Sequence, residues 1–173
     1  MWSFRRPKLK KARRPVTSAK RTHYHRHREQ AREHIAAKLA YFNQYYQLSY
    51  NRVAIRNQRR CWGSCSAKRN LNFSYKLLFL PECLRDYIIV HELCHLRELN
   101  HSVRFWAAVE EVLPDYAERS AVLRKFERTH GTSVTALQMW QRNHDNESCA
   151  FCANMESLPR PVVQSSPNRV SVL

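Results

Sequence analysis

The sequence predicts an α+β fold in which a small sheet packs against a helix that carries metal ligands. Three observations support this prediction. Apolar residues recur at helical spacing early in the chain, short alternating segments lie between residues 53 and 75, and further helical patterns follow Leu80. The length of 173 residues is that of one domain with tails. No apolar run approaches the ~20 residues of a membrane span, so no membrane association is expected.

The first half of the domain is expected to hold one long helix and the sheet. Residues 53–55 alternate apolar and polar side chains as a strand does. Residues 61–66 and 71–75 predict two more strands, joined by a polar turn over residues 67–70. The sheet can be antiparallel or mixed. Residues 22–48 predict the amphipathic helix, whose apolar side contains Ile35, Leu39, Phe42 and Tyr46.

Residues 91–95 form the HExxH pattern, with two histidines four apart and a glutamate between them. That spacing brings both imidazoles to one face of a helix, where they can hold one metal ion. Pro81 suits the first position of this helix, and Glu82 favours the positive end of its dipole. The β-branched run before the motif would alone favour a strand, but the proline start and the ligand spacing favour the helix.

His101 is the third candidate ligand. On a continuous helix it would lie roughly 15 Å along the axis from His91, whereas a Zn–N bond is about 2 Å long. The chain must therefore turn between them, and Asn100 suits a left-handed residue after a helix end. Ser102 is then predicted to cap a second helix over residues 103–113.

Other arrangements of these residues remain open at this stage. Two histidines on a helix can be satisfied core residues that bind no metal. Cys94 lies inside the motif but points away from the ligand face, so we expect a small buried side chain. A carboxylate can also replace His101 as the third ligand, and the nearby candidates are Glu98, Glu110 and Glu111.

Three histidine ligands predict a catalytic zinc site rather than a structural one, because the fourth tetrahedral position stays open for water. Zinc lowers the pKa of bound water toward about 7, and Glu92 would be the general base. Zinc is inferred from the chemistry, since imidazole suits several divalent ions. Residue type alone leaves four candidates for the oxyanion stabiliser: Arg59, Arg60, Tyr75 and Tyr116.

A last helix is expected at the end of the domain. Asp115 and Glu118 form a capping-box pattern at its start, and Gly131 marks its end. From about residue 143 the chain is polar and aperiodic, which predicts disorder. This segment holds only half of a four-ligand zinc site, Cys149 and Cys152.

Several separated motifs together resemble the YgjP-like metal-dependent hydrolase family, also described as a YgjP-type metallopeptidase domain. The resemblance spans roughly residues 22 to 128. The motifs that carry it are Cys61-Trp62-Gly63-Ser64-Cys65-Ser66, Asn70-Leu71-Asn72-Phe73, Leu80-Pro81, Asp86-Tyr87, the HExxH pattern with Leu96, Asn100-His101-Ser102, Phe105-Trp106 and Leu113-Pro114-Asp115-Tyr116.

The resemblance implies a zincin-like α+β domain related to the SprT and WLM groups. It implies Glu92 as the base and zinc ligands at His91, His95 and His101. The family usually has arginine before the Trp-Gly-Ser-Cys-Ser run, where this chain has Cys61. In zincin-like folds an edge strand lines the cleft and can pair with an extended peptide, and we expect residues 71–75 in that role.

The expected organisation is a basic disordered arm over residues 1–21, a zincin-like metallohydrolase domain over residues 22–131 and a mostly disordered tail over residues 132–173. The six cysteines are expected to be thiols in the cytoplasm, because the basic N-terminus shows no secretory signal. The oligomeric state does not follow from the sequence.

Charge suggests a second partner. Thirty Lys and Arg against 14 Asp and Glu give a formal net charge of +16. Residues 1–30 contain eleven Lys and Arg and one Glu, a net of +10, which leaves +6 for the rest. Such a block favours polyanions through counterion release, so the arm is a candidate for binding nucleic acid. A solvated arm with no specific role explains the charge equally well.

The sequence therefore predicts a zinc metallohydrolase, with a metallopeptidase acting on a peptide or protein favoured. A nucleotide pyrophosphatase that uses the same zinc site is one alternative, because the same metal and water chemistry attacks phosphorus. The other alternative is a nucleic-acid-associated zinc protein without catalysis. Glu92 distinguishes a catalytic zinc site from a structural one, because a structural site does not require a general base beside its ligands.

Overall fold

The computed structural model describes residues 18–131, 133 and 135–138. Most of the predicted arm and tail, including Cys149 and Cys152, lies outside these residues. Within them, a three-stranded mixed sheet and several helices give the predicted α+β class. Residues 135–138, inside the predicted tail, are helical, and Leu137 is fully buried.

Helix α1 (Ser18–Tyr46) begins four residues before the predicted domain boundary. It packs through a stripe of buried side chains at helical spacing, Ala31, Ile35, Leu39 and Phe42. The helix ends where Gln47 takes a positive φ of 50°. Asn43 closes that end, because its side chain exchanges two 2.9 Å hydrogen bonds with the backbone of Leu48.

The sheet has the order β1-β3-β2. Strand β1 (Arg52–Arg56) runs parallel to β3 (Asn70–Ser74), and β2 (Gly63–Cys65) runs antiparallel to it. Strand β3 is therefore central and has both of its edges paired. The expectation that residues 71–75 form the substrate-binding edge was wrong, because strand order depends on pairing that a single strand's pattern does not encode.

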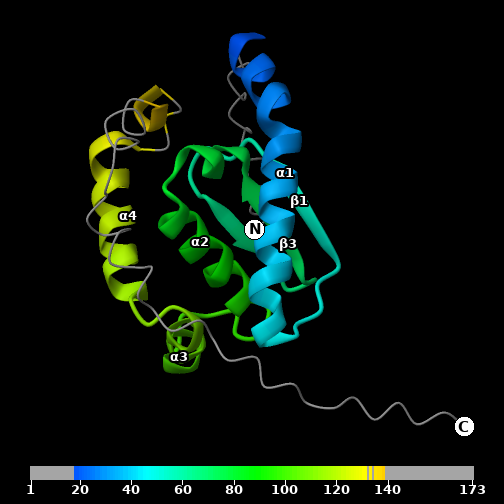
Figure 1. The fold of residues 1–173 in the computed structure, drawn as a ribbon, viewed down its shortest axis with the longest axis vertical. Coiled ribbons are helices and arrows are strands. Elements are labelled where there is room, and N and C mark those ends of the chain that lie inside the picture. The colour runs from blue at the N-terminus through cyan, green and yellow to red at the C-terminus, as the bar shows by residue number, and fades with distance from the viewer. Residues whose placement is uncertain (1–17, 132, 134, 139–173) are drawn as a thin grey trace, which may run out of the picture.

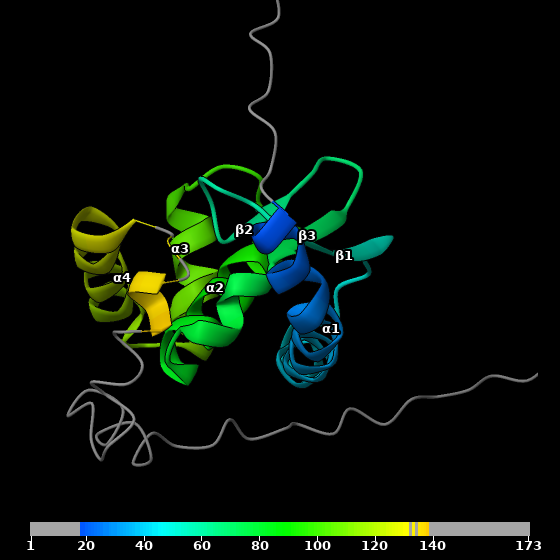
Figure 2. The same ribbon diagram turned by 90° about the horizontal axis from the view of Figure 1, so that it is seen from above.

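One face of the sheet is apolar and is covered by helices. Ile55 and Phe73 are paired in register and lie on this face, as does Leu71, and all three are buried. Figure 2 shows α1 and α2 on this side of the sheet. The 3₁₀ helix η1 (Tyr75–Phe79) follows β3 and packs against α1.

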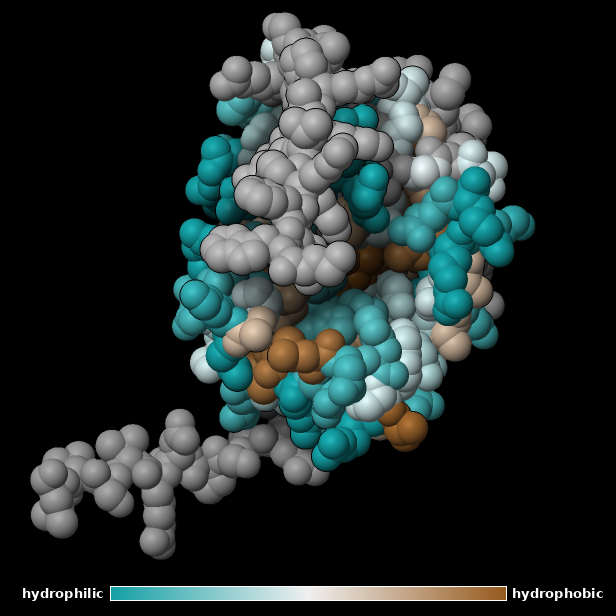
Figure 3. Space-filling model, turned by 180° about the vertical axis from the view of Figure 1, so that it is seen from behind, coloured by the Kyte–Doolittle hydropathy of each residue, from teal (hydrophilic) through white to brown (hydrophobic). Residues whose placement is uncertain are grey.

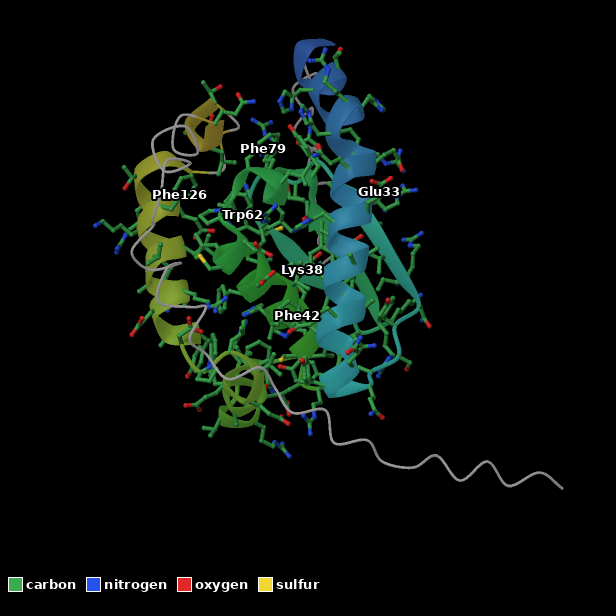
Figure 4. The ribbon with its side chains drawn as sticks, viewed as in Figure 1. Glu33, Lys38, Phe42, Trp62, Phe79 and Phe126 are labelled. Atoms are coloured by element: carbon green, nitrogen blue, oxygen red, sulfur yellow. The ribbon has the colours of Figure 1, made fainter. Side chains whose placement is uncertain are left out.

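Helix α2 (Glu82–Cys94) runs through the core between α1 and α4, as Figure 1 shows. Nine of its thirteen residues are buried, which explains why apolar residues surround it. Pro81 is the residue before the helix rather than its first residue. Lys38 of α1, labelled in Figure 4, binds Glu82 and, at 3.1 Å, Asp86, and so joins the two helices.

Helices α3 (Val103–Val112) and α4 (Tyr116–His130) complete the domain. Ser102 caps α3 as predicted, since its hydroxyl accepts a hydrogen bond from the Phe105 amide at 3.3 Å. Gly131 follows α4 with a φ of 59°. None of the helices that the structure describes is long and apolar enough to cross a membrane.

The predicted capping box at the start of α4 does not form, because Asp115 makes no side-chain cap bond. Its two carboxylate oxygens instead accept from Nε of Arg119, each at 2.9 Å. The Arg119 side chain is 1% exposed and donates also to the carbonyl of Cys83 in α2, at 2.8 Å. A buried guanidinium therefore fixes α4 against α2.

We expect Arg119→Met to lower the free energy of unfolding by roughly 3 kcal/mol, because it leaves a partly buried carboxylate and a carbonyl without their donor. Arg124→Met is the matched control on the same helix, where Arg124 is exposed and binds only Ser120. Urea denaturation measures both variants. Equal losses would show that Arg119 contributes nothing beyond an exposed arginine.

Candidate metal centre

Three imidazoles converge beside the end of α2. His91 lies in the last turn of α2, His95 is the residue at its C-cap, and His101 lies just before α3. One ligand atom from each ring lies within 4.8 Å of the others. Nε2 of His101 is 3.1 Å from Nε2 of His91. Two nitrogens bound to a tetrahedral zinc at about 2 Å lie roughly 3.3 Å apart, so this spacing suits one metal ion.

A tight turn between α2 and α3 returns His101 to the other two histidines. The amide of Glu98 donates to the carbonyl of Cys94 at 3.0 Å. Asn100 is not in the left-handed region that we expected, since Gln47 and Arg69 are the non-glycine residues with positive φ in the described part of the chain. Its side-chain oxygen instead accepts from the amide of Ser102 at 3.2 Å, as in an Asx turn.

Aromatic rings of α3 support the three imidazoles. Phe105 is fully buried, and its ring centroid lies 4.9 Å from that of His91, 4.5 Å from His95 and 4.8 Å from His101. Trp106 stacks on His101 at 5.6 Å. Because rigid aromatic packing limits ring rotation, α3 sets the direction in which the imidazole nitrogens point.

The surroundings keep the two helix histidines neutral, which is the form that binds metal. Burial, followed by the neighbouring imidazoles of His95 and His101, lowers the pKa of His91 to about 3. Burial is also the main cause of the lowered pKa of His95. Nδ1 of His95 lies 3.1 Å from the carbonyl oxygen of Glu98, a contact that orients the ring and leaves Nε2 for a ligand.

Glu92 is buried beside this cluster, with 6% of its surface exposed. Among the described residues its Oε2 atom has no hydrogen-bond partner. Burial raises the pKa of this carboxyl to about 8. A buried carboxyl with one unpartnered oxygen, next in sequence to His91, fits a site that holds a cation and a water molecule.

Strand β2 lies against Glu92 through Gly63. A Cβ at position 63 would lie 2.5 Å from Cγ of Glu92 and 2.7 Å from its Oε1, closer than real contacts allow. Our sequence reasoning gave Gly63 no role at the site. The signal was present, because the chain has only two glycines and a glycine within a strand often marks a close approach.

The residue before Gly63 fixes this strand to α4. Trp62 is buried, and its Nε1 donates to Oε1 of Glu127 at 2.7 Å. Figure 4 shows Trp62 in the interior, between α1 and α4. The strand that covers Glu92 is thus held by a hydrogen bond from the far side of the domain.

The alternative third ligands lie elsewhere. The carboxylate of Glu98 pairs with Arg104 at 3.5 Å, and that of Glu111 pairs with Arg97 at 3.7 Å. Glu110 is exposed on α3. None of the three belongs to the group of potential metal ligands found among the described residues. Cys94 is fully buried, as expected, and its thiol donates to the hydroxyl of Tyr46.

The four oxyanion candidates differ in position. Tyr75 is buried beneath α1, and its hydroxyl lies 3.3 Å from Nδ1 of His23. Arg59 and Arg60 are exposed before β2. The fourth candidate is Tyr116. Its ring stacks on Trp106, with the ring centroids 5.2 Å apart, and Trp106 in turn stacks on His101.

Cys61, where the resemblance led us to expect arginine, borders the site. Burial and then the charge of Glu92 raise the pKa of the Cys61 thiol. The same two causes raise the pKa of Cys65. Both are free thiols. Position 61 is therefore close enough to Glu92 for an arginine there to interact with the carboxyl electrostatically.

Comparison with known proteins gives one family. The family model described as "YgjP-like, metallopeptidase domain" matches residues 5–126. The crystal structure of the metallopeptidase zymogen of Pyrococcus abyssi abylysin is 29% identical in sequence, with 56% of this chain and 92% of that chain covered. Its TM-score of 0.40 is too low for structural conclusions. No curated protein matches the chain.

We expect Gly63→Ala to lower kcat by about 100-fold, because the new methyl group displaces the Glu92 carboxyl. Zinc content should be unchanged, since position 63 offers no ligand. Ser64→Ala, on the opposite face of the same strand, is the control and should keep full activity. Peptidase kinetics and metal analysis of both variants test this, and normal turnover by Gly63→Ala would contradict it.

In the metal-free protein, the stability that Glu92 contributes should fall as pH rises from about 4.5 to about 8. The folded protein retains a proton on Glu92 that the unfolded chain has released, because burial raises the pKa of this carboxyl from 4.5 to about 8. Glu92→Gln removes this penalty, so at pH 8.5 the variant should be more stable by on the order of 2 kcal/mol. Urea denaturation in chelator at pH 4 and pH 8.5 measures the difference. The idea fails if the difference between variant and wild type is the same at both pH values.

Proposed function

The chain belongs to the YgjP-like metallopeptidase family, and we propose that it is a zinc-dependent peptidase of zincin-like architecture. One observation carries the proposal: a buried carboxyl with an oxygen unpartnered among the described residues adjoins, in sequence, three histidines whose ligand atoms lie within 4.8 Å of one another. Glu92 is the general base, and the metal ligands are His91, His95 and His101.

The donor set fits zinc. Three imidazoles would hold the ion, and a catalytic zinc keeps a further position for water. Such an ion acts as a Lewis acid and lowers the pKa of coordinated water toward about 7. His91 and His95 are ready for this role, because their lowered pKa values keep them unprotonated near neutral pH. His101, the exposed member of the set, lies where the site opens to solvent.

Glu92 has the position and environment of a general base. Its carboxyl lies beneath the backbone of Gly63, between β2 and the histidine cluster. A nearby cation favours the ionised form, which offsets the effect of burial on its pKa. The ionised carboxylate accepts a proton from the attacking water and then donates it to the leaving amine. Both transfers use the oxygen that lacks a partner within the protein.

Strand β2 is the proposed substrate-binding edge. Among the described strands it pairs only with β3, which leaves its other edge for an extended peptide. Gly63 lies in this strand and touches Glu92, so a peptide paired with β2 would present its backbone to the site. Main-chain pairing gives affinity without fixing a sequence, which suits a peptidase whose side-chain specificity is set elsewhere.

We expect Glu92→Gln to retain one zinc ion per chain and to lower the turnover of casein-derived peptides by about 1,000-fold. His101→Ala should lose zinc and activity together, because only two ligands remain. Glu110→Gln, an exposed glutamate of α3, is the control and should match the wild type. Metal analysis of the purified protein, with peptide turnover measured before and after chelation, provides both readouts.

Two outcomes would contradict the proposal. If Glu92→Gln cleaves peptides as fast as the wild type, the carboxyl is not the base. If the wild type with zinc hydrolyses nucleoside triphosphates but no peptide, the site is a nucleotide hydrolase and the peptidase assignment is wrong.

A further inference from the structure

Charge is unevenly distributed within the folded domain. Between Glu33 and Glu82 the sequence contains no acidic residue but eight Lys and Arg. This stretch includes all three strands of the sheet. From Glu82 to Arg128, the helical part that follows, nine acids accompany seven Lys and Arg. The positive charge of the domain therefore gathers on the sheet and its loops, apart from the charge of the N-terminal arm.

The strand register places part of this charge on the face opposite the core. Ile55 and Phe73 point into the core, so their neighbours along each strand point outward. Arg52 is paired in register with Asn70, and Arg56 with Ser74. Asn72 and Ser64, also paired in register, continue this polar face onto β2.

No described helix covers this outer face. In Figure 2, α1 and α2 lie together on the other side of the sheet. Figure 3, seen from behind, shows hydrophilic side chains along the margin on the β1 side. A sheet with one covered and one open face usually carries a polar open face, but a face with basic residues and no acid is not required for solubility.

The charges on and beside this face are not neutralised within the protein. Four basic side chains are exposed there and form no ion pair with a described residue: Arg52, Arg56, Arg60 and Lys68. Some basic residues elsewhere in the domain are paired, as Arg97 is with Glu111 and Arg104 with Glu98, whereas Lys125 and Arg128 form no ion pair with a described residue. Unpaired cations on an open face are available to an external anion.

We propose that the outer face of the sheet binds the sugar-phosphate backbone of duplex nucleic acid without reading its sequence. Arg52 and Arg56 lie four residues apart on one strand, roughly 13 Å, which lets them contact separate phosphates. Asn70, Asn72 and Ser64 are partly exposed, and their amide and hydroxyl groups suit phosphate oxygens and sugars. The outward positions of β1 and β3 hold no aromatic ring for stacking bases, and such rings are the mark of single-strand binding.

This surface is distinct from the proposed peptidase site and does not depend on it. The basic side chains that the test removes lie on β1, at the opposite edge of the sheet from β2, whereas Glu92 and the metal ligands lie on and after α2. Nucleic-acid binding can therefore be measured with the catalytic residues intact.

The test compares two charge-matched variants of the full chain. Arg52→Gln/Arg56→Gln removes two charges from the outer face, and Lys125→Gln/Arg128→Gln removes two exposed charges from α4. Fluorescence anisotropy measures binding to two labelled 20-base-pair DNA duplexes of unrelated sequence between 50 and 200 mM NaCl. Zinc content and thermal unfolding check that both variants remain folded.

We expect the sheet variant to bind both duplexes about tenfold more weakly at 50 mM NaCl. The magnitude of the slope of log K against log salt should fall by about 1.8, since two phosphate contacts are lost. The α4 variant should bind like the wild type.

Three results would overturn the inference. Equal losses in the two variants would show that net charge alone decides binding, and no loss in either would assign binding to the N-terminal arm. The third is a sheet variant that keeps its affinity for DNA but loses binding to phosphatidylserine vesicles, because the face would then serve an anionic membrane.

Discussion

The arrangement of this domain depends on a carboxyl group buried in its core. Glu92 lies on the buried helix α2 with an oxygen that no described residue satisfies, which costs free energy unless a cation is close. Three features of the fold accommodate this carboxyl and place the metal ligands beside it. A glycine leaves room above the carboxyl, aromatic rings of α3 hold the imidazoles, and the turn after α2 brings the last imidazole within reach of the first. The domain exchanges some stability for a site that a metal ion completes.

Features set by near neighbours in the sequence could be predicted. Helical spacing fixed the relative positions of His91 and His95, and Ser102 was recognised as a cap because its partner, the amide of Phe105, lies three residues away. Local rules failed where a distant or competing partner was available. Asp115 is of a residue type and at a position that favour N-capping, yet its carboxylate binds Arg119 instead. The guanidinium of Arg119 also donates to the carbonyl of Cys83 in α2.

Features set by long-range pairing could not be predicted. The pattern of β3 is that of any half-buried strand, and its central place follows only from which strands pair with it. The contact between Gly63 and Glu92, and the hydrogen bond from Trp62 to Glu127, join segments that no sequence period connects. The candidate site is therefore half predictable: its ligands come from a local motif, whereas the strand that covers its base comes from the tertiary fold.

The sheet gives this domain two different recognition surfaces. A peptide added at β2 would use main-chain groups of the edge, which any sequence supplies. A polyanion on the outer face would use the side chains of Arg52 and Arg56. Substituting these side chains would leave the backbone pairing of β1 with β3 intact. Because alternation separates these side chains from the core face, the basic face can change without disturbing Ile55 and Phe73, on which the sheet packs. Folding therefore does not require the basic residues of the outer face, whereas the buried carboxyl restricts the residues on the opposite face. Binding to an anionic partner explains these basic residues better than folding does.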